Sequence, residues 1–300
     1  MSRVLVTGGS GLIGRRTVAA LIGAGHEVHA TTRGTAPADT GEVTWHQADL
    51  LTSTDVVTEV RADVLVHLAW NVEHGSFWTS PDNERWRDAS LPLLERFARA
   101  GGRRAVLAGT CAEYDWTTGD GIMREGETLL RPATLYGRCK DALRASAEAV
   151  EGIDVAWGRV FFLYAPDEAP TKLFGSVARA LLAGERAETT PGTQVRDFLH
   201  VDDVGGAFAA LAESAVTGAV NIGSGEGVQV RELVEEIGAA VGRPELLAIG
   251  ARPAPEGEPP VIVAGLDRLA DEVGFVPHFS LRRGVRDAVR ALTIRLGSDA

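Results

Sequence analysis

The sequence predicts an α/β protein with a doubly wound parallel sheet and a smaller C-terminal lobe that binds substrate. Two features of the first half lead to this prediction: short apolar runs alternate with amphipathic helical stretches, and a glycine cluster follows the first run. The second half is less regular. We expect the main domain over residues 1–164 and about 196–224, and the substrate lobe over about 165–195 and 225–300.

The apolar runs have the length of buried strands, and the stretches between them have helical periodicity. Strands are predicted, in chain order, at residues 4–6, 28–31, 64–68, 105–108 and 155–163. Helices are predicted at about residues 12–24, 53–60, 86–100 and 135–151. Glycines follow the first and third helices, where they commonly end a helix. Right-handed crossovers between parallel strands then give a Rossmann arrangement.

The first strand runs into the turn "TGGSGLIG" at residues 7–14. Its spacing is Gly-x-x-Gly-x-x-Gly, and missing side chains there permit a tight turn and close approach of a pyrophosphate to backbone N–H groups. An ordinary turn between a strand and a helix is the alternative. We expect a dinucleotide cofactor to bind at Gly8, Gly11, Leu12, Ile13 and Gly14.

The end of the second strand decides which dinucleotide is expected. A carboxylate there normally binds the ribose hydroxyls of NAD, but this chain has Thr32 followed by Arg33. A guanidinium without a competing carboxylate suits a 2′-phosphate, so NADP(H) is predicted, with NAD as the alternative. Asp49, in "QADL", is a candidate for the adenine amino group or an ordinary surface-turn aspartate.

Tyr136 and Lys140 stand four residues apart in "TLYGRCK", in a chain with three tyrosines and two lysines. Chance alone would give about 0.02 such pairs, so a coincidence is a poor explanation. Positions i and i+4 share a helix face. The ammonium is expected to lower the pKa of the phenol toward neutrality, which would let Tyr136 exchange protons with an alcohol or a ketone.

Composition and net charge argue against several classes of partner and location. A net charge of −11 argues against nucleic acid, which requires a basic surface. No apolar run is long enough to span a bilayer, and the N-terminus has no signal-peptide pattern, so a cytoplasmic protein is expected. The two cysteines, Cys111 and Cys139, form no metal or disulfide framework, and no metal is predicted.

Taken together, these motifs resemble the extended short-chain dehydrogenase/reductases, in the NAD-dependent epimerase/dehydratase family that works on nucleotide sugars. The resemblance covers nearly the whole chain. The matching pieces are "TGGSGLIG" at 7–14, "ADL" at 48–50, "HLA" at 67–69, "GTCAEY" at 109–114, "YGRCK" at 136–140, "GRVFFLYAP" at 158–166, "RDFLHVDDV" at 196–204 and "NIGSG" at 221–225.

The resemblance implies further site residues. It implies a catalytic Ser/Thr about 25 residues before the tyrosine, for which Thr110 is preferred to Cys111 because a hydroxyl is the better hydrogen-bond partner. Lys140 would hold the nicotinamide ribose. Leu50, Leu68 and Ala69 would line the cofactor site, while Trp70, Cys111, Glu113, Arg196 and Arg252 are the candidates for substrate binding, Arg196 at the diphosphate.

Several reactions remain open. Family dehydratases carry an Asp-Glu pair after the catalytic Ser/Thr, and Cys111–Ala112 in its place disfavours dehydration. We expect an NADPH-dependent reductase of an NDP-4-keto-6-deoxyhexose, with a 4-epimerase that holds NAD tightly as the alternative. A non-catalytic NADP sensor and a reductase of non-nucleotide ketones are less favoured. The resemblance also implies a homodimer through helices at residues 92–99 and 136–149.

Overall fold

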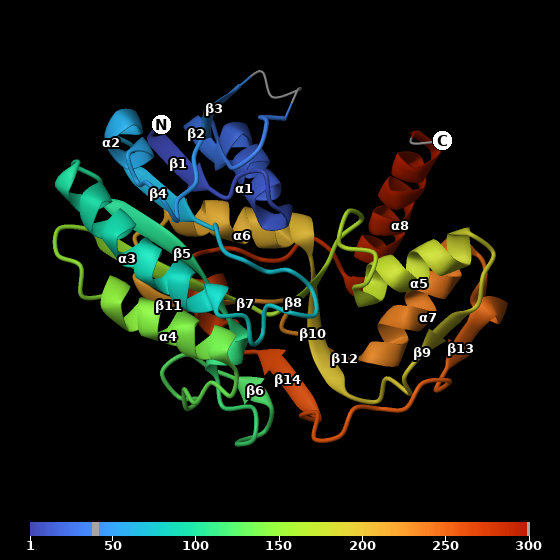
Figure 1. Cartoon of the computed structure of the whole chain (residues 1–300). Helices are drawn as coiled ribbons and strands as arrows, with labels where there is room; N and C mark the ends of the chain where they lie inside the picture. Colours follow the sequence, from blue (N-terminus) through green and yellow to red (C-terminus); the bar gives the residue numbers. More distant parts are fainter. Residues whose placement is uncertain (38–41, 299–300) are drawn as a thin grey trace.

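The computed structural model describes residues 1–37 and 42–298, which form two lobes (Figure 1). The larger lobe is built on a seven-stranded sheet in the order β11-β7-β5-β4-β1-β2-β3, with every neighbouring pair parallel. Its strands are β1 (Arg3–Thr7), β2 (Glu27–Thr32), β3 (Val43–Gln47), β4 (Val64–His67), β5 (Arg104–Thr110), β7 (Asp154–Val160) and β11 (Gly218–Ile222). The predicted α/β class with a Rossmann sheet is confirmed.

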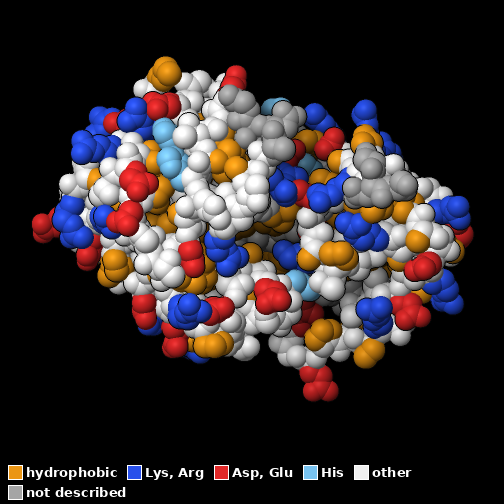
Figure 2. All heavy atoms as spheres, turned by 45° about the horizontal axis from the view of Figure 1, so that its top comes forward, with side chains coloured by type: hydrophobic (Ala, Val, Ile, Leu, Met, Phe, Trp, Pro, Cys, Tyr) orange, Lys and Arg blue, Asp and Glu red, His pale blue; other side chains and the backbone are white. Residues whose placement is uncertain are grey.

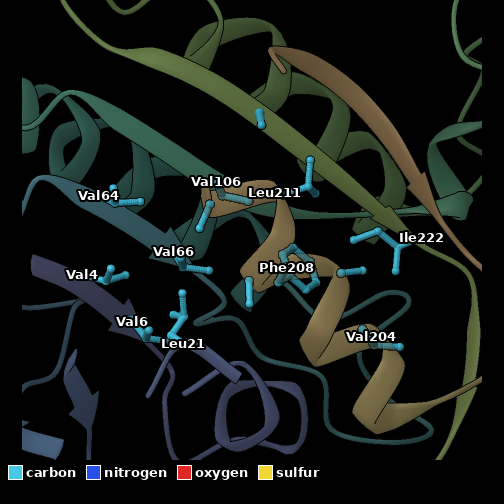
Figure 3. Close-up of a cluster of buried hydrophobic side chains, with 14 of the residues drawn as sticks. Val4, Val6, Leu21, Val64, Val66, Val106, Val204, Phe208, Leu211 and Ile222 are labelled. Carbon is cyan, nitrogen blue, oxygen red and sulfur yellow. The ribbon is translucent and has the colours of Figure 1, made fainter. Parts of the chain in front are cut away.

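Helices cover both faces of this sheet because successive strand residues point to opposite sides. Val4 and Val6 of β1 pack in a cluster with α1 (Leu12–Gly23) and α6 (Val201–Glu213), as Figure 3 shows. Leu5, between them, packs in a second cluster with α2 (Val56–Val60), α3 (Asp82–Arg99) and α4 (Leu135–Ala147). Both cores are therefore specified by the same apolar runs.

The smaller lobe combines helices with short strands. A second sheet has the order β12-β10-β14-β6, with β8 paired to β10, and β13 pairs with β9 in a separate ladder. The helices and strands are β6 (Ile122–Met123), β8 (Phe162–Tyr164), α5 (Leu173–Leu182), β9 (Ala187–Thr189), β10 (Val195–His200), β12 (Gly227–Gln229), α7 (Val230–Val241), β13 (Leu247–Ile249), β14 (Val261–Ala264) and α8 (Leu281–Ser298). Between β10 and β12 the chain returns to the large sheet as α6 and β11.

The predicted strand over residues 155–163 is two strands. β7 ends at Val160 and pairs within the large sheet, whereas β8 begins at Phe162 and pairs with β10 of the second sheet. Phe161 lies between them, with a buried side chain and an amide that donates to the carbonyl of Ile222. The unbroken apolar run conceals this change of sheet, because all three segments are buried or partly buried.

The predicted helix ends differ from the observed ones by up to four residues. α3 begins at Asp82 rather than 86, and α4 ends at Ala147 rather than 151. α2 covers only Val56–Val60, because residues 53–55 form a turn in which Ser53 and Asp55 hydrogen-bond to each other. Among residues 1–37 and 42–298, none of the helices combines the length and the hydrophobicity that a bilayer-spanning segment requires.

Candidate active site

The strand order reverses between β1 and β4, and this defines the place where a ligand can enter. In open parallel sheets the crevice lies outside the carboxyl ends of the strands at such a reversal. The glycine turn follows β1, and Leu68 and Ala69 follow β4 at the same edge. The predicted cofactor residues of both segments therefore lie together.

The glycine turn forms a cradle that side chains would fill. Gly8 has φ +68°, and a Cβ built on it would lie 2.8 Å from the backbone nitrogen of Ala69. A Cβ on Gly14 would collide with the carbonyl oxygen of Gly8. Gly11 is exposed at the start of α1 and its N–H donates to the carbonyl of Gly8 at 2.9 Å. A backbone cradle at a helix N-terminus fits a dinucleotide pyrophosphate.

At the end of β2 the structure places Arg33 on the surface and Thr32 in the interior. The hydroxyl of Thr32 accepts hydrogen bonds from the hydroxyl of Ser10 in the glycine turn and from the N–H of Gly34. Asp49 is also exposed, and its carboxylate accepts from the N–H of Leu51. Leu50, in contrast, buries its side chain in the core below the sheet, so only its backbone could face a cofactor.

Tyr136 and Thr110 lie near each other at the carboxyl end of β5. Thr110 ends β5, and Tyr136 is the second residue of α4, whose first turn is capped by the Thr134 hydroxyl accepting from the N–H of Gly137. A Cβ on Gly137 would collide with the carbonyl oxygen of Ala112, so glycine allows α4 to lie against the segment that follows Thr110. The Thr110 side chain lies close enough to the phenol of Tyr136 to lower the pKa of that phenol.

Lys140 lies behind this pair. The residue is 4% exposed, and its ammonium donates to the carbonyl oxygen of Ala108 at 2.8 Å and lies 3.7 Å from the ring centroid of Trp70. The distance from the same nitrogen to the ring centroid of Tyr136 is 5.9 Å. Burial lowers the pKa of Lys140 from 10.5 to about 7, and the carboxylate of Glu113 opposes that change.

The predicted lowering of the Tyr136 pKa is wrong for this structure. Burial raises the pKa of the phenol, the negative charge of Glu113 raises it further, and only the hydrogen bond from Thr110 opposes these effects. Lys140 does not lower it here because its ammonium is directed to Ala108 and Trp70. The phenol therefore holds its proton at neutral pH.

Two predicted substrate residues, Glu113 and Cys111, have buried side chains. Glu113 is fully buried and accepts from the N–H of Thr110 at 2.8 Å, from the indole of Trp157 and from the guanidinium of Arg159 at 2.7 Å. Cys111 packs in an apolar cluster, and burial raises its thiol pKa to about 12. Glu113 thus holds the backbone of Thr110 in place, and its own carboxylate is not accessible in this structure.

The arginines predicted for the substrate also differ from expectation. Arg196 is 3% exposed, and its guanidinium donates to Glu258 at 2.8 Å and to the carbonyl of Val195. It is therefore ion-paired in this structure rather than presented as an open fork. Arg252 is exposed in the smaller lobe. On the face of the molecule drawn in Figure 2, acidic and basic side chains are mixed, without an extended basic surface.

Two buried polar residues at the site, Asn83 and His67, were not predicted from the sequence. Asn83 is 1% exposed; its amide donates to the carbonyls of Phe77 and Ser80, and its oxygen accepts from the indole of Trp70 at 2.8 Å. His67 lies between the hydroxyls of Thr7 and Ser90, and burial lowers its pKa to about 3. Asn83 is a polar residue within an amphipathic helix and His67 ends a strand, and neither position signals that its side chain will be buried between polar partners.

Comparison with known proteins gives a consistent family. A family model described as the NAD dependent epimerase/dehydratase family matches residues 4–223. The chain is similar to a UDP-glucose 4-epimerase from Azospirillum brasilense, with 31% identity over 96% of this chain and 91% of the relative. It is equally similar to a dTDP-6-deoxy-L-talose 4-dehydrogenase (NAD(P)(+)) from Kitasatospora kifunensis, with 31% identity over 95% of this chain and 94% of the relative.

Solved structures of other proteins are also similar to this chain. MoeE5 in complex with UDP-glucuronic acid and NAD superposes with a TM-score of 0.83 and 31% identity, covering 98% of this chain and 99% of that one. A UDP-glucose 4-epimerase from Thermotoga maritima has a TM-score of 0.87 at 22% identity, covering 98% of this chain and 99% of that one, and is similar in fold.

Proposed function

The chain belongs to the NAD-dependent epimerase/dehydratase family, and on that premise we propose that it interconverts an alcohol and a ketone at C4 of the hexose in a nucleoside diphosphate sugar. Of the two candidate net reactions, we favour 4-epimerisation. One observation carries the proposal: Tyr136, Thr110 and Lys140 converge at the carboxyl edge of the sheet, next to the glycine cradle. The family is an NAD(P)-dependent one.

The residues that would hold the cofactor are those of the cradle. Gly8, Gly11 and Gly14 leave room for a pyrophosphate, and Leu68 and Ala69 border the same space. When bound, a nicotinamide supplies or accepts hydride at the substrate carbon. The protein must then move the accompanying proton on the C4 oxygen.

Tyr136 performs the proton step in this proposal. Its phenol is protonated at neutral pH, so it can donate a proton to an oxygen that becomes an alkoxide. The hydroxyl of Thr110 lies near the phenol and would orient the same substrate oxygen. Removing a proton from an alcohol requires the phenolate, and the cationic form of Lys140 is the group on the same helix face that could stabilise it.

A second candidate is reduction of a 4-keto sugar with exchangeable NADPH. It is favoured by the end of β2, where Thr32 takes the place of a carboxylate and Arg33 is exposed, and by a phenol already set as an acid. The relative from Kitasatospora kifunensis is a 4-dehydrogenase named for both NAD and NADP. This candidate uses the same three residues.

Product analysis separates the two. The purified protein is incubated with UDP- and dTDP-hexoses and NAD, and with NDP-4-keto sugars and NADPH or NADH, while nicotinamide absorbance and product NMR are followed. An epimerase inverts C4 without net change in absorbance. A reductase consumes one reduced nicotinamide per sugar, and the exposed Arg33 predicts a lower KM for NADPH than for NADH. No turnover with any pair contradicts both candidates.

A further inference from the structure

A buried carboxylate lies beside the catalytic segment that ends β5. Glu113 is fully buried, and its two side-chain oxygens face different donors. Oε1 accepts from the N–H of Thr110 at 2.8 Å and from the indole N–H of Trp157 at 2.9 Å, whereas Oε2 accepts from the guanidinium of Arg159 at 2.7 Å. These donors satisfy the carboxylate and fix its position, because each bond restricts one of its oxygens.

The turn that follows β5 is closed by hydrogen bonds in both directions. The N–H of Thr110 donates to Glu113, and the hydroxyl oxygen of Thr110 accepts from the N–H of Ala112 at 3.2 Å. This reciprocal arrangement is a capping box, which fixes the first residue of the turn together with its side chain. The hydroxyl that lies near the phenol of Tyr136 therefore has a set direction, and its hydrogen remains available to a substrate oxygen.

Gly109, the residue before Thr110, leaves the space that the carboxylate occupies. A Cβ built on Gly109 would collide with the indole nitrogen of Trp157 and would lie 2.8 Å from Oε1 of Glu113. A side chain at this position would therefore displace the carboxylate from Thr110. The arrangement depends on a glycine inside β5, where a glycine otherwise weakens the strand.

Two opposite charges hold the end of β5. The ammonium of Lys140 donates to the carbonyl of Ala108, and the carboxylate of Glu113 accepts from the N–H of Thr110. Burial lowers the pKa of Lys140, and the negative charge of Glu113 acts against this change. His67 also lies near the ammonium but is uncharged at neutral pH, because burial lowers its pKa to about 3. Glu113 is therefore the counter-charge that favours the ammonium.

From these contacts we propose that Glu113 is a positioning residue for the proton step at C4: its buried carboxylate fixes the hydroxyl of Thr110 and supplies the charge that keeps Lys140 cationic. The inference rests on the proposed function, because it gives Glu113 a part in the step that Tyr136 performs. The carboxylate is inaccessible, so it acts through Thr110 and Lys140 instead of touching the sugar. The direct substrate contact expected from the sequence is replaced by this indirect role.

The charge of Glu113 has a consequence for the pH dependence of turnover. When the protonated phenol of Tyr136 gives its proton to the C4 oxygen, a phenolate forms, and the cationic form of Lys140 stabilises it. This step slows as the pH rises through the pKa of Lys140, about 7. Without the carboxylate, Lys140 loses its proton at a lower pH, so kcat should begin to fall at a lower pH while KM for the sugar changes little.

NMR of lysine measures the charge directly, because the chain has two lysines, Lys140 and Lys172. In the full chain labelled with ¹³C-lysine, Lys140→Met assigns the two signals. We expect Lys140 to titrate near pH 7 in the wild-type protein and about one pH unit lower in Glu113→Gln. Trp157→Phe is the matched control, because it removes a donor to the same carboxylate but keeps the charge, and it should leave the titration midpoint unchanged.

A second variant provides for the loss of stability in Glu113→Gln, which leaves the buried guanidinium of Arg159 without its counter-charge. The double substitution Glu113→Gln with Arg159→Gln removes both charges and should shift the midpoint in the same direction. Thermal melts verify that the variants are folded. An unchanged Lys140 midpoint in a folded variant that lacks the carboxylate, or an equal shift in Trp157→Phe, overturns the role of Glu113. Absence of turnover in the wild-type protein with every NDP-sugar overturns the proposed function, and the titration does not depend on it.

Discussion

Tyr136 holds its proton because the protein encloses it. Aromatic rings cover the phenol, Glu113 adds a buried negative charge, and the single compensating group is Thr110. Lys140 lies on the expected face of α4 but binds Ala108 and Trp70. The spacing of two residues on a helix predicts which groups share a face, but the direction of a long lysine side chain depends on acceptors elsewhere in the fold.

The buried ammonium of Lys140 makes stability depend on pH. Its pKa is about 7 in the folded protein and 10.5 ordinarily, so between these values the unfolded chain holds a proton that the folded chain releases. Raising the pH through this window therefore favours folding by about 1.4 kcal/mol per pH unit. Relative to Lys140→Met, the wild-type protein should be least stable below pH 7 and recover toward pH 10.

Urea unfolding of both proteins at pH 6, 8 and 9.5 measures this difference. Contributions of all other titrating groups cancel in the comparison, apart from those that touch Lys140. A difference that is constant over this range, or that changes in the opposite direction, contradicts the assignment of a buried ammonium with a lowered pKa.

The contact between α4 and the turn after β5 is the element on which the site depends. Gly137 permits it, because a side chain there would collide with the carbonyl of Ala112 and lie 2.9 Å from the Cβ of Pro132. Gly137→Ala should separate Tyr136 from Thr110 and reduce kcat about 10- to 100-fold, since small displacements of catalytic groups are costly.

A glycine in open space provides the control for that substitution. A Cβ added to Gly23, in α1, would have no atom within 4 Å, so Gly23→Ala should leave kcat unchanged and stabilise the helix by about 0.5–1 kcal/mol. Steady-state kinetics and thermal melts compare the two variants. Unchanged kcat in a folded Gly137→Ala protein would show that the close approach is not needed.

α3 and α4 also provide a candidate interface between two copies of the chain, as the family resemblance implies. The exposed face of α4 includes Ala142, Ala145 and Ser146, whose small side chains allow helices to approach closely. We expect a dimer that Ala145→Arg dissociates, with Ala239→Arg on the exposed side of α7 as the control. Light scattering after size exclusion measures the mass, and a wild-type monomer would refute this interface.

For the molecule as a whole, the centre of the larger lobe could be predicted from sequence, whereas its edge strands β3 and β11, its helix α6 and the smaller lobe were not predicted. β1, β4 and β5 contribute to the cores on both faces of the sheet, so each gives a nearly continuous apolar run next to a periodic helix. β6 and β12 have two and three residues, too few to show any period. The paired residues Ile122 and Val263 are distant in sequence, and nothing local to either indicates the other.

At the site, too, local sequence predicts some residues, whereas pairings between distant segments decide the others. Gly8, Gly11 and Gly14 were predictable because the turn itself requires glycine, and Tyr136 because its helix position is local information. The partner of Arg196 was not, since Glu258 is 62 residues away and reaches it only through the pairing of β10 with β14. Contacts between segments that are distant in sequence decide whether a polar residue is free to bind a ligand.

Tyr136 is proposed to move the proton on the C4 oxygen, and turnover of Tyr136→Phe with the best NDP-sugar substrate of the wild-type protein tests this. The variant keeps the ring, so it should bind NAD(P) with unchanged affinity while kcat falls by about 10²–10⁴. Retention of kcat within tenfold of wild type, with the cofactor bound equally, would contradict the claim.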